Sequence, residues 1–184
     1  TEVHLHNYMI DLDFVMESCP GLSTVPHIVV IHGDGRPPRA RSVLAAPHRF
    51  LCLQPPVERY GTHHSKMAVV VRPDRIQVSV TTANFIYSDW MNKTNGVWTG
   101  LFPQQTPEQR QAALNSPRAG FEADFLNYYD ALKNLGVAPT PTWQPHSAQL
   151  SQDWTSLDLR CLRGYDYSCS PARLLASVPG RHTG

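Results

Sequence analysis

The stretch KMAVVVRPDRIQVSVTT, residues 66–82, decides the fold class of this 184-residue chain. Two β-branched runs, 66–71 and 76–82, flank an RPDR segment whose proline and aspartate are typical of tight turns. The pattern predicts two antiparallel strands that form a hairpin. A three-residue turn would place position 64 opposite position 84, and other turn lengths shift this pairing by one residue. We therefore expect the hairpin to bring positions 64 and 84 to the same end of a sheet, with the register left open.

Strands and helices are expected to alternate along the rest of the chain. The clearest helix covers residues 121–135, where aromatic and aliphatic side chains recur at helical spacing and Gly136 follows as a C-terminal cap. The other predicted elements are strands at 7–10, 27–33, 50–53 and 173–177, a helix that begins at Asp11 or Asp13, and a helix around 154–162. This alternation indicates an α/β fold, in a single domain that spans residues 1–184.

Two segments interrupt the pattern. Residues 101–117 are rich in glutamine and proline and are expected to form a surface insertion. Residues 137–152 contain three prolines and are expected to form a linker-like loop.

Composition narrows the classes of function. Hydrophobic residues make up 41% of the chain and charged residues 17%, as in a globular protein with a core. A net charge of +1, with nine neutral histidines, excludes nucleic-acid binding through an extensive basic surface but not through a local basic groove. No run of eighteen apolar residues occurs, so we expect no membrane span. The four cysteines form no CxxC pair, so we expect no metal site, and a start without methionine suggests a piece of a longer protein.

The strongest functional signal lies at the start of the hairpin. His64 and Lys66 are two positions apart and would share one face of a strand. Asn84 follows eighteen residues after Lys66, beyond the turn. An imidazole, an ammonium and a carboxamide that converge on one point predict a site for phosphate chemistry that needs no metal or cofactor.

The chemistry follows from the properties of these groups. A neutral imidazole can attack the phosphorus of a phosphodiester, which gives a phosphohistidine and releases one alcohol, and water then hydrolyses the adduct. Lys66 and Asn84 are donors suited to the nonbridging oxygens, where negative charge develops. Asn95 is a candidate to hold the second ring nitrogen of His64.

Each of these residues also has an ordinary structural interpretation. A histidine on a strand is often a satisfied structural group, a lysine at the start of a strand often guards an edge, and an asparagine after a strand often forms a turn. His63 would point to the opposite face from His64, and we interpret it as structural. Tyr60 precedes the turn at Gly61, where it could stack on a nucleobase or pack under its own loop. Ser65, inside the same motif, is grouped with Tyr60 as a candidate nucleic-acid contact.

Several separated segments together resemble one known family, the tyrosyl-DNA phosphodiesterases of the phospholipase D superfamily. The segments are YGTHHSKM (60–67), TANFI (82–86), DW (89–90), KTNGVW (93–98), IHGD (31–34), FEAD (121–124) and SVPGR (177–181). The resemblance implies one phospholipase D-like half, with a mixed β-sheet sandwiched between helices. The superfamily commonly has an aspartate shortly after the motif lysine. Here Val71 occupies that region, and Asn84 takes the role, as in the tyrosyl-DNA phosphodiesterase variant.

The resemblance also implies roles and an activity. His64 would be the nucleophile, with Lys66 and Asn84 on the phosphate. Asn95 falls where the family has a glutamine near the nucleophile, and Tyr60 falls where it has an aromatic that stacks on DNA. The implied activity is hydrolysis of the bond between a DNA 3′ phosphate and the tyrosine of a stalled topoisomerase peptide, in nuclear DNA repair, without metal or cofactor.

One departure from the family concerns the number of motifs. The family carries two HxK motifs, and the second histidine serves as general acid and then as base, whereas this sequence has one HxK. We therefore expect an N-terminal half whose partner is the missing C-terminal half, and which is inactive or nearly so alone. Two alternatives remain open: a one-motif nuclease that completes its site by dimerising, and a non-catalytic module that binds DNA ends or protein.

Overall fold

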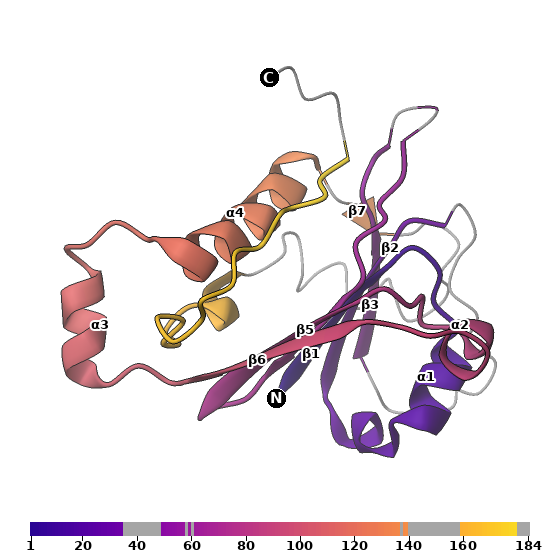
Figure 1. The fold of residues 1–184 in the computed structure, drawn as a ribbon, viewed down its shortest axis with the longest axis horizontal. Coiled ribbons are helices and arrows are strands. Elements are labelled where there is room, and N and C mark those ends of the chain that lie inside the picture. Colours follow the sequence, from indigo (N-terminus) through magenta and orange to yellow (C-terminus); the bar gives the residue numbers. More distant parts are fainter. Residues whose placement is uncertain (35–48, 58, 60, 137, 140–158, 180–184) are drawn as a thin grey trace.

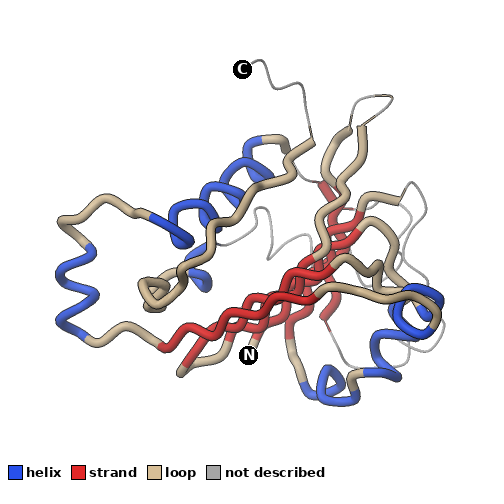
Figure 2. Tube along the Cα trace, in the orientation of Figure 1, coloured by secondary structure: helices blue, strands red, loops and turns tan. Residues whose placement is uncertain are grey.

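A seven-stranded mixed sheet forms the centre of the computed structural model, with the strand order β6-β5-β4-β1-β2-β3-β7 (Figures 1 and 2). The structure describes residues 1–34, 49–57, 59, 61–136, 138–139 and 159–179. The strands are β1 (Glu2–Asn7), β2 (His27–His32), β3 (Arg49–Gln54), β4 (Met67–Val71), β5 (Arg75–Thr81), β6 (Val97–Pro103) and β7 (Ala138–Pro139). Strands β1, β2 and β3 are parallel, and the remaining neighbours are antiparallel.

Helices cover both faces of this sheet. They are α1 (Leu12–Ser18), α2 (Tyr87–Met91), α3 (Pro107–Ala113) and α4 (Gly120–Asn134), with the 3₁₀ helices η1 (Pro20–Thr24) and η3 (Leu159–Leu162). Figure 1 shows α4 over one face, α1 and α2 against the other, and α3 beyond β6. The arrangement confirms the predicted α/β class, a mixed sheet sandwiched between helices.

Two cores result, one on each face of the sheet. Alternate residues of the central strand β2 belong to different cores: Val29 and Ile31 pack with α4, whereas Ile28 and Val30 pack with α1. A strand buried on both faces must be apolar at nearly every position, which explains the continuous β-branched run that identified β2 in the sequence. No helix among the described residues is long and apolar enough to cross a membrane.

The predicted helix at 121–135 is confirmed as α4. Its buried side chains repeat at helical spacing and include Phe121, Phe125, Tyr129 and Leu132. Gly136 adopts a φ of +76°, and its N–H bonds the Lys133 carbonyl at 3.0 Å. A positive φ is favourable for glycine, so this residue ends the helix as predicted. The helix predicted from Asp11 is also confirmed, because the Asp11 side chain accepts a hydrogen bond from the Phe14 N–H.

The predicted hairpin exists, but its register differs from the one given for a three-residue turn. Met67 pairs with Val80, which places position 64 opposite position 83 when the pairing is extended. Strand β4 also begins only at Met67, so the HxK motif lies in the segment that leads into the strand. Turn length alone determines this offset of one residue, which the sequence had left open.

Several boundary predictions were wrong. The first strand is β1, at Glu2–Asn7 rather than 7–10, because its histidines interrupt the apolar run. The segment 101–117 is no simple loop: it completes β6 and contains α3, whose Thr106 and Gln109 form a capping box. No strand forms at 173–177.

Other predictions fall partly outside the described residues. Of the helix predicted at 154–162, the described part, from 159, is the 3₁₀ helix η3. Of the loop predicted at 137–152, only 138–139 are described, and they form β7. The prediction of a single domain over 1–184 stays a prediction.

Candidate active site

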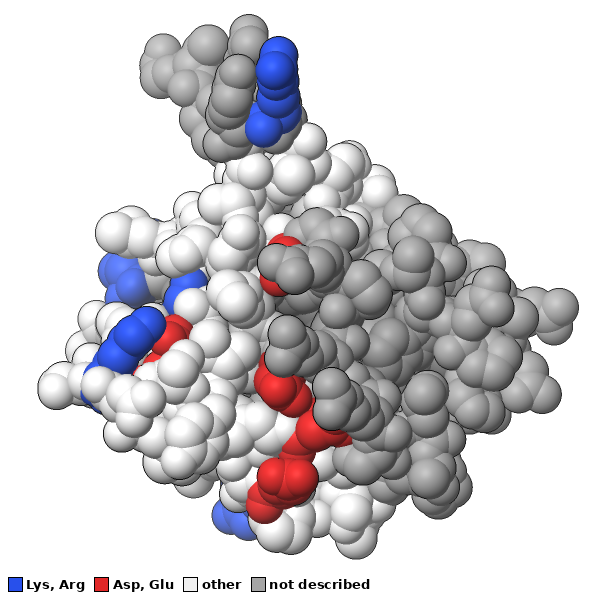
Figure 3. Space-filling view, turned by 90° about the vertical axis from the view of Figure 1, so that its right-hand side faces the viewer, with Lys and Arg blue, Asp and Glu red and all other residues white. Residues whose placement is uncertain are grey.

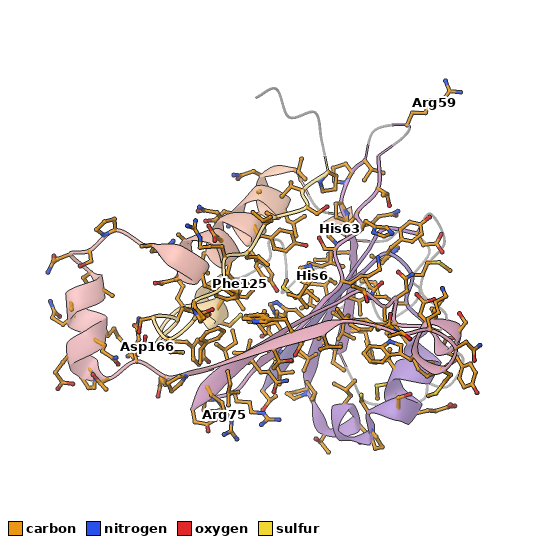
Figure 4. All side chains as sticks on the ribbon, in the orientation of Figure 1. His6, Arg59, His63, Arg75, Phe125 and Asp166 are labelled. Atoms are coloured by element: carbon orange, nitrogen blue, oxygen red, sulfur yellow. The ribbon has the colours of Figure 1, made fainter. Side chains whose placement is uncertain are left out.

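The HxK segment lies at the end of the sheet where β1 and β2 finish and β4 begins. Gly33, directly after β2, packs against it so closely that an added Cβ atom would lie 2.1 Å from the carbonyl oxygen of His63. The Gly33 N–H contacts the carbonyls of Asn7 and Tyr8, at 3.1 and 3.2 Å. Figure 4 shows His63 at this end of the sheet, near the side that α4 covers. A glycine at position 33 therefore lets three chain segments meet at the site.

His64 and Lys66 form the centre of the site. The Lys66 ammonium lies 3.0 Å from His64 Nδ1, 3.2 Å from Nε2 and 3.2 Å from the His64 carbonyl oxygen. The His64 side chain is exposed, whereas Lys66 is only 8% exposed. The ring of Tyr8 lies beside the imidazole, with 5.5 Å between the ring centroids. The imidazole thus faces solvent with a cation held against it.

The electrostatics favour a neutral imidazole. Burial and then the charge of Lys66 hold the pKa of His64 below its usual value. Burial also lowers the pKa of Lys66, which the carboxylate of Asp89 partly opposes. A cation this close to the ring disfavours a second positive charge on the imidazole. A neutral imidazole is the form that can act as a nucleophile.

Asn84 is held by a buried carboxylate that the sequence interpretation missed. The backbone N–H and the side-chain Nδ2 of Asn84 both donate to Asp89 Oδ2, each at 2.9 Å. Lys93 donates to the other oxygen, Oδ1, and Asp89 is 4% exposed. These hydrogen bonds, that of Lys93 above all, hold the pKa of Asp89 below its usual range, so it stays ionised.

This carboxylate links the second and third members of the predicted triad. Asp89 acts on the pKa of Lys66 and fixes the carboxamide of Asn84. Nδ2 of Asn84 uses one hydrogen on Asp89 and has a second one to offer, while its Oδ1 has no partner among the described residues. The signal available in the sequence was an aspartate four residues before a lysine at the start of a short helix.

Asn95 lies in a different environment from the one predicted. Its Nδ2 donates to the carbonyls of Asp89 and Lys93, at 2.6 and 3.1 Å, and its Oδ1 accepts from the Thr82 hydroxyl at 3.2 Å. These bonds close the loop between β5 and β6. Among the described residues none of its hydrogen bonds reaches His64, so the orienting role stays a prediction without a supporting contact.

The two predicted nucleic-acid contacts remain untested. Tyr60 lies outside the described residues. Ser65 Oγ lies 3.2 Å from the Ser177 carbonyl, and with Tyr128 and Lys66 it lines a cavity of about 190 Å³. It therefore points to the α4 side.

His63 is fully buried, as its structural interpretation requires. Burial first, and then His32, Lys66 and His64, lower its pKa to about 4. Both ring nitrogens lack a hydrogen-bond partner among the described residues. Neighbouring histidines thus lie in opposite environments, one exposed and one enclosed.

The surface charge fits the near-neutral composition. Figure 3 shows the side of the molecule at the right of Figure 1; there acidic side chains gather near the centre, and lysine and arginine lie toward the edges. On this face the described residues offer no broad basic surface.

Comparison with known proteins gives consistent matches. The family model described as tyrosyl-DNA phosphodiesterase matches residues 1–184. The chain is 35% identical to tyrosyl-DNA phosphodiesterase 1 of Arabidopsis thaliana over 184 residues, which is 98% of this chain and 28% of that protein. It is 30% identical over 125 residues to a probable tyrosyl-DNA phosphodiesterase of Caenorhabditis elegans, covering 67% of this chain and 22% of that one.

The fold has solved relatives as well. The crystal structure of the yeast tyrosyl-DNA phosphodiesterase aligns with a TM-score of 0.57 at 14% identity, over 73% of this chain and 32% of that one. Its H432N variant aligns over 91% of this chain with a TM-score of 0.59 at 12% identity, over 36% of that chain. At such identities the likeness shows the fold alone. The chain spans less than a third of the length of the curated relatives described above.

Proposed function

Because the chain belongs to the tyrosyl-DNA phosphodiesterase family, we propose that it supplies the nucleophile of a phosphodiesterase that cleaves a tyrosyl peptide from a DNA 3′ phosphate. The observation that carries the proposal is the contact between Lys66 Nζ and the exposed ring of His64, at 3.0 and 3.2 Å. This contact joins a neutral nucleophile to a cation, which is the pair that attack on a phosphodiester needs.

In the proposed mechanism a ring nitrogen of His64 attacks the phosphorus, and the bond to the tyrosine oxygen breaks. A phosphohistidine to the DNA 3′ end results, and water later releases the DNA 3′ phosphate. The Lys66 ammonium moves from the imidazole to the nonbridging oxygens, where charge builds up. Asn84 adds its free Nδ2 hydrogen, in a direction that Asp89 sets.

A second half of the protein would complete the site. The leaving tyrosine oxygen needs a proton, and water then needs a base. His64 is occupied by phosphorus at that stage, so we assign both tasks to a histidine in a C-terminal half. We accordingly propose that the 184-residue chain alone binds substrate but turns it over poorly, and that the complete protein acts in nuclear DNA repair.

A single-stranded oligonucleotide with a 3′-phosphotyrosine tests this proposal. We expect the complete protein to release tyrosine, and His64→Ala to reduce the rate by about 10³-fold or more, in the range of lost nucleophiles. Lys66→Ala should cost about 10²-fold, as for a lost charge on a developing oxyanion. His182→Ala, a histidine without a lysine two positions later, serves as the matched control and should keep the wild-type rate.

Trapping adds a second readout. A short reaction stopped with denaturant should leave a covalent protein–DNA adduct that is stable to alkali and lost in acid, as a phosphoramidate is. Wild-type turnover in the His64→Ala protein, or an adduct that maps to another residue, would contradict the proposal. Full turnover by the isolated chain as a monomer would contradict the need for a second half.

A further inference from the structure

A continuous chain of polar side chains runs under α4, from the far end of β1 to the HxK segment. Its hydrogen-bonded members, in order, are Glu2, His4, Tyr129, His6 and Tyr128, and Ser65 lies beside Tyr128 at the end of the chain. The four links from Glu2 to Tyr128 measure 2.6, 2.9, 2.8 and 3.1 Å. Tyr128 and Ser65 then line the same cavity. Figure 4 shows His6 between the sheet and α4.

The sequence places these groups in line. Glu2, His4 and His6 alternate along β1, so they share the face that α4 covers. Tyr128 and Tyr129 are consecutive in α4, and both are buried. Both histidines are fully buried as well, so every hydrogen-bonding group in the middle of the chain must find its partner within it.

Counting hydrogens then gives one direction for the whole chain. When Glu2 is ionised and His4 is neutral, His4 Nε2 donates to Glu2 and His4 Nδ1 accepts from the Tyr129 hydroxyl. The Tyr129 oxygen then accepts from His6 Nε2, and His6 Nδ1 accepts from the Tyr128 hydroxyl. Tyr128 is left with an oxygen that can accept from Ser65. Every link has one donor and one acceptor, with neutral histidines and tyrosines throughout.

The environment supports the neutral forms of His6, Tyr128 and Tyr129. Burial, with smaller contributions from His63 and His4, holds the pKa of His6 well below its usual value. Burial raises the pKa of Tyr128 and Tyr129, which keeps both hydroxyls protonated. Glu2 lies at the open end, where its side chain is 17% exposed.

We propose that the carboxylate of Glu2 sets the direction of every hydrogen in this chain, and that Tyr128 at its other end is a positioning residue for the HxK segment. The Ser65 hydroxyl bonds the Ser177 carbonyl at 3.2 Å and lines one cavity with Tyr128. With the direction set by Glu2, the Tyr128 hydroxyl donates to His6 Nδ1, and a lone pair of its oxygen faces Ser65. Helix α4 thereby holds the residue between His64 and Lys66.

A metal ion is the rival explanation for the Glu2 end. Ligand atoms of Glu2, His4 and Cys161 lie within 4.8 Å of one another. However, Glu2 Oε1 and His4 Nε2 are 2.6 Å apart, whereas zinc bonds of about 2.0–2.1 Å in a tetrahedral site separate two ligands by about 3.3 Å. The short distance is that of a charge-assisted hydrogen bond.

Nitrogen NMR of the histidine rings in the 184-residue chain tests the direction. At neutral pH we expect His4 and His6 both as neutral Nε2–H tautomers. Glu2→Leu removes the acceptor and should give mixed tautomers, whereas Glu2→Gln retains a carbonyl acceptor and should keep them. Glu17→Leu, at an exposed acid on α1, is the matched control and should change neither ring.

Several results would overturn the direction. They are a Nδ1–H tautomer of His6, a doubly protonated His4 at neutral pH, or unchanged tautomers in Glu2→Leu. A stoichiometric shift of the His4 nitrogens when zinc alone is added would favour the metal site instead. None of these readouts depends on catalysis.

The positioning role rests on the proposed function and is tested in the complete protein. Tyr128→Phe removes one oxygen and should lower kcat about tenfold with KM unchanged, while the His6 Nδ1 resonance shifts. Tyr167→Phe is the matched control: this buried hydroxyl bonds the Leu162 carbonyl, away from the chain, and its loss should leave kcat unchanged. An unchanged kcat in Tyr128→Phe would overturn the positioning role. A wild-type protein without activity would instead overturn the proposed function, and the NMR result would stand alone.

Discussion

Asp89 holds Asn84 through a pair of 2.9 Å hydrogen bonds, one from the backbone and one from the carboxamide. The carboxylate is buried and also carries the bond from Lys93. A carboxylate of helix α2 thus fixes the direction of the amide that the proposed phosphate chemistry uses. Asp89 therefore positions one of the three predicted site residues.

Replacing Asp89 tests its positioning role. Asp89→Ala leaves the Asn84 amide without its partner, and we expect a loss of about 1–3 kcal/mol in the free energy of unfolding, as for other broken buried hydrogen bonds. The rate of the complete protein should fall further than that of Lys93→Met, because Lys93 is 62% exposed and does not contact Asn84. Urea unfolding and the phosphotyrosine assay measure the two effects. Equal rates for both variants would argue against the role.

Lys66 controls the protonation of His64. Its charge, after burial, lowers the pKa of the imidazole. In Lys66→Met we therefore expect a higher His64 pKa, measured by NMR titration of the ring protons. In the proposed mechanism the neutral imidazole attacks. As the pH is lowered, any residual activity should therefore begin to fall at a higher pH than in the wild type. Lys133→Met, an exposed lysine on α4, should leave the His64 titration unchanged.

His63 makes the fold sensitive to acid. The pKa of His63 is about 4 in the folded state, below the ordinary value of 6.5. As the pH falls, the unfolded state is therefore protonated before the folded state, which favours unfolding. The stability present above pH 6.5 is therefore lost progressively down to about pH 4, by about 3 kcal/mol for this group. Urea unfolding at pH 7.5 and 4.5 should show a smaller loss for His63→Leu. The same pH dependence in both proteins would contradict this prediction.

The contact at Gly33 predicts a local steric effect. In Gly33→Ala the new methyl group would lie 2.1 Å from the His63 carbonyl oxygen and 3.0 Å from the Tyr8 ring. The backbone of the HxK segment must move, at a cost of about 1–3 kcal/mol as for other overpacked sites. Gly21→Ala, where an added Cβ atom meets nothing within 4 Å, is the matched control. Thermal unfolding and the His64 NMR signals should change in the first variant only.

Asn95 separates the predicted orienting role from the contacts seen. Its hydrogen bonds close the loop between β5 and β6. We expect Asn95→Ala to increase hydrogen exchange of the Thr82 and Gly96 amides while the His64 pKa stays at its wild-type value. A changed His64 titration would restore the orienting role that the family resemblance implies.

The local pattern of the chain was enough to predict several elements. Periodicity over a short window predicts strand β2, the hairpin of β4 and β5, and helix α4. The pair His64 and Lys66 was also found from spacing alone, since residues two apart on an extended segment project to the same side. In each case the information lies within a few neighbouring residues.

The remaining features depend on partners that are distant in sequence. Tyr128 and Tyr129 meet His6 and His4 across more than 120 residues, and no periodicity encodes such a pairing. The same holds for the contact of Gly33 with His63. Burial made His4 and His6 hydrogen-bonded core groups, because a polar atom removed from water bonds whatever the packing brings to it.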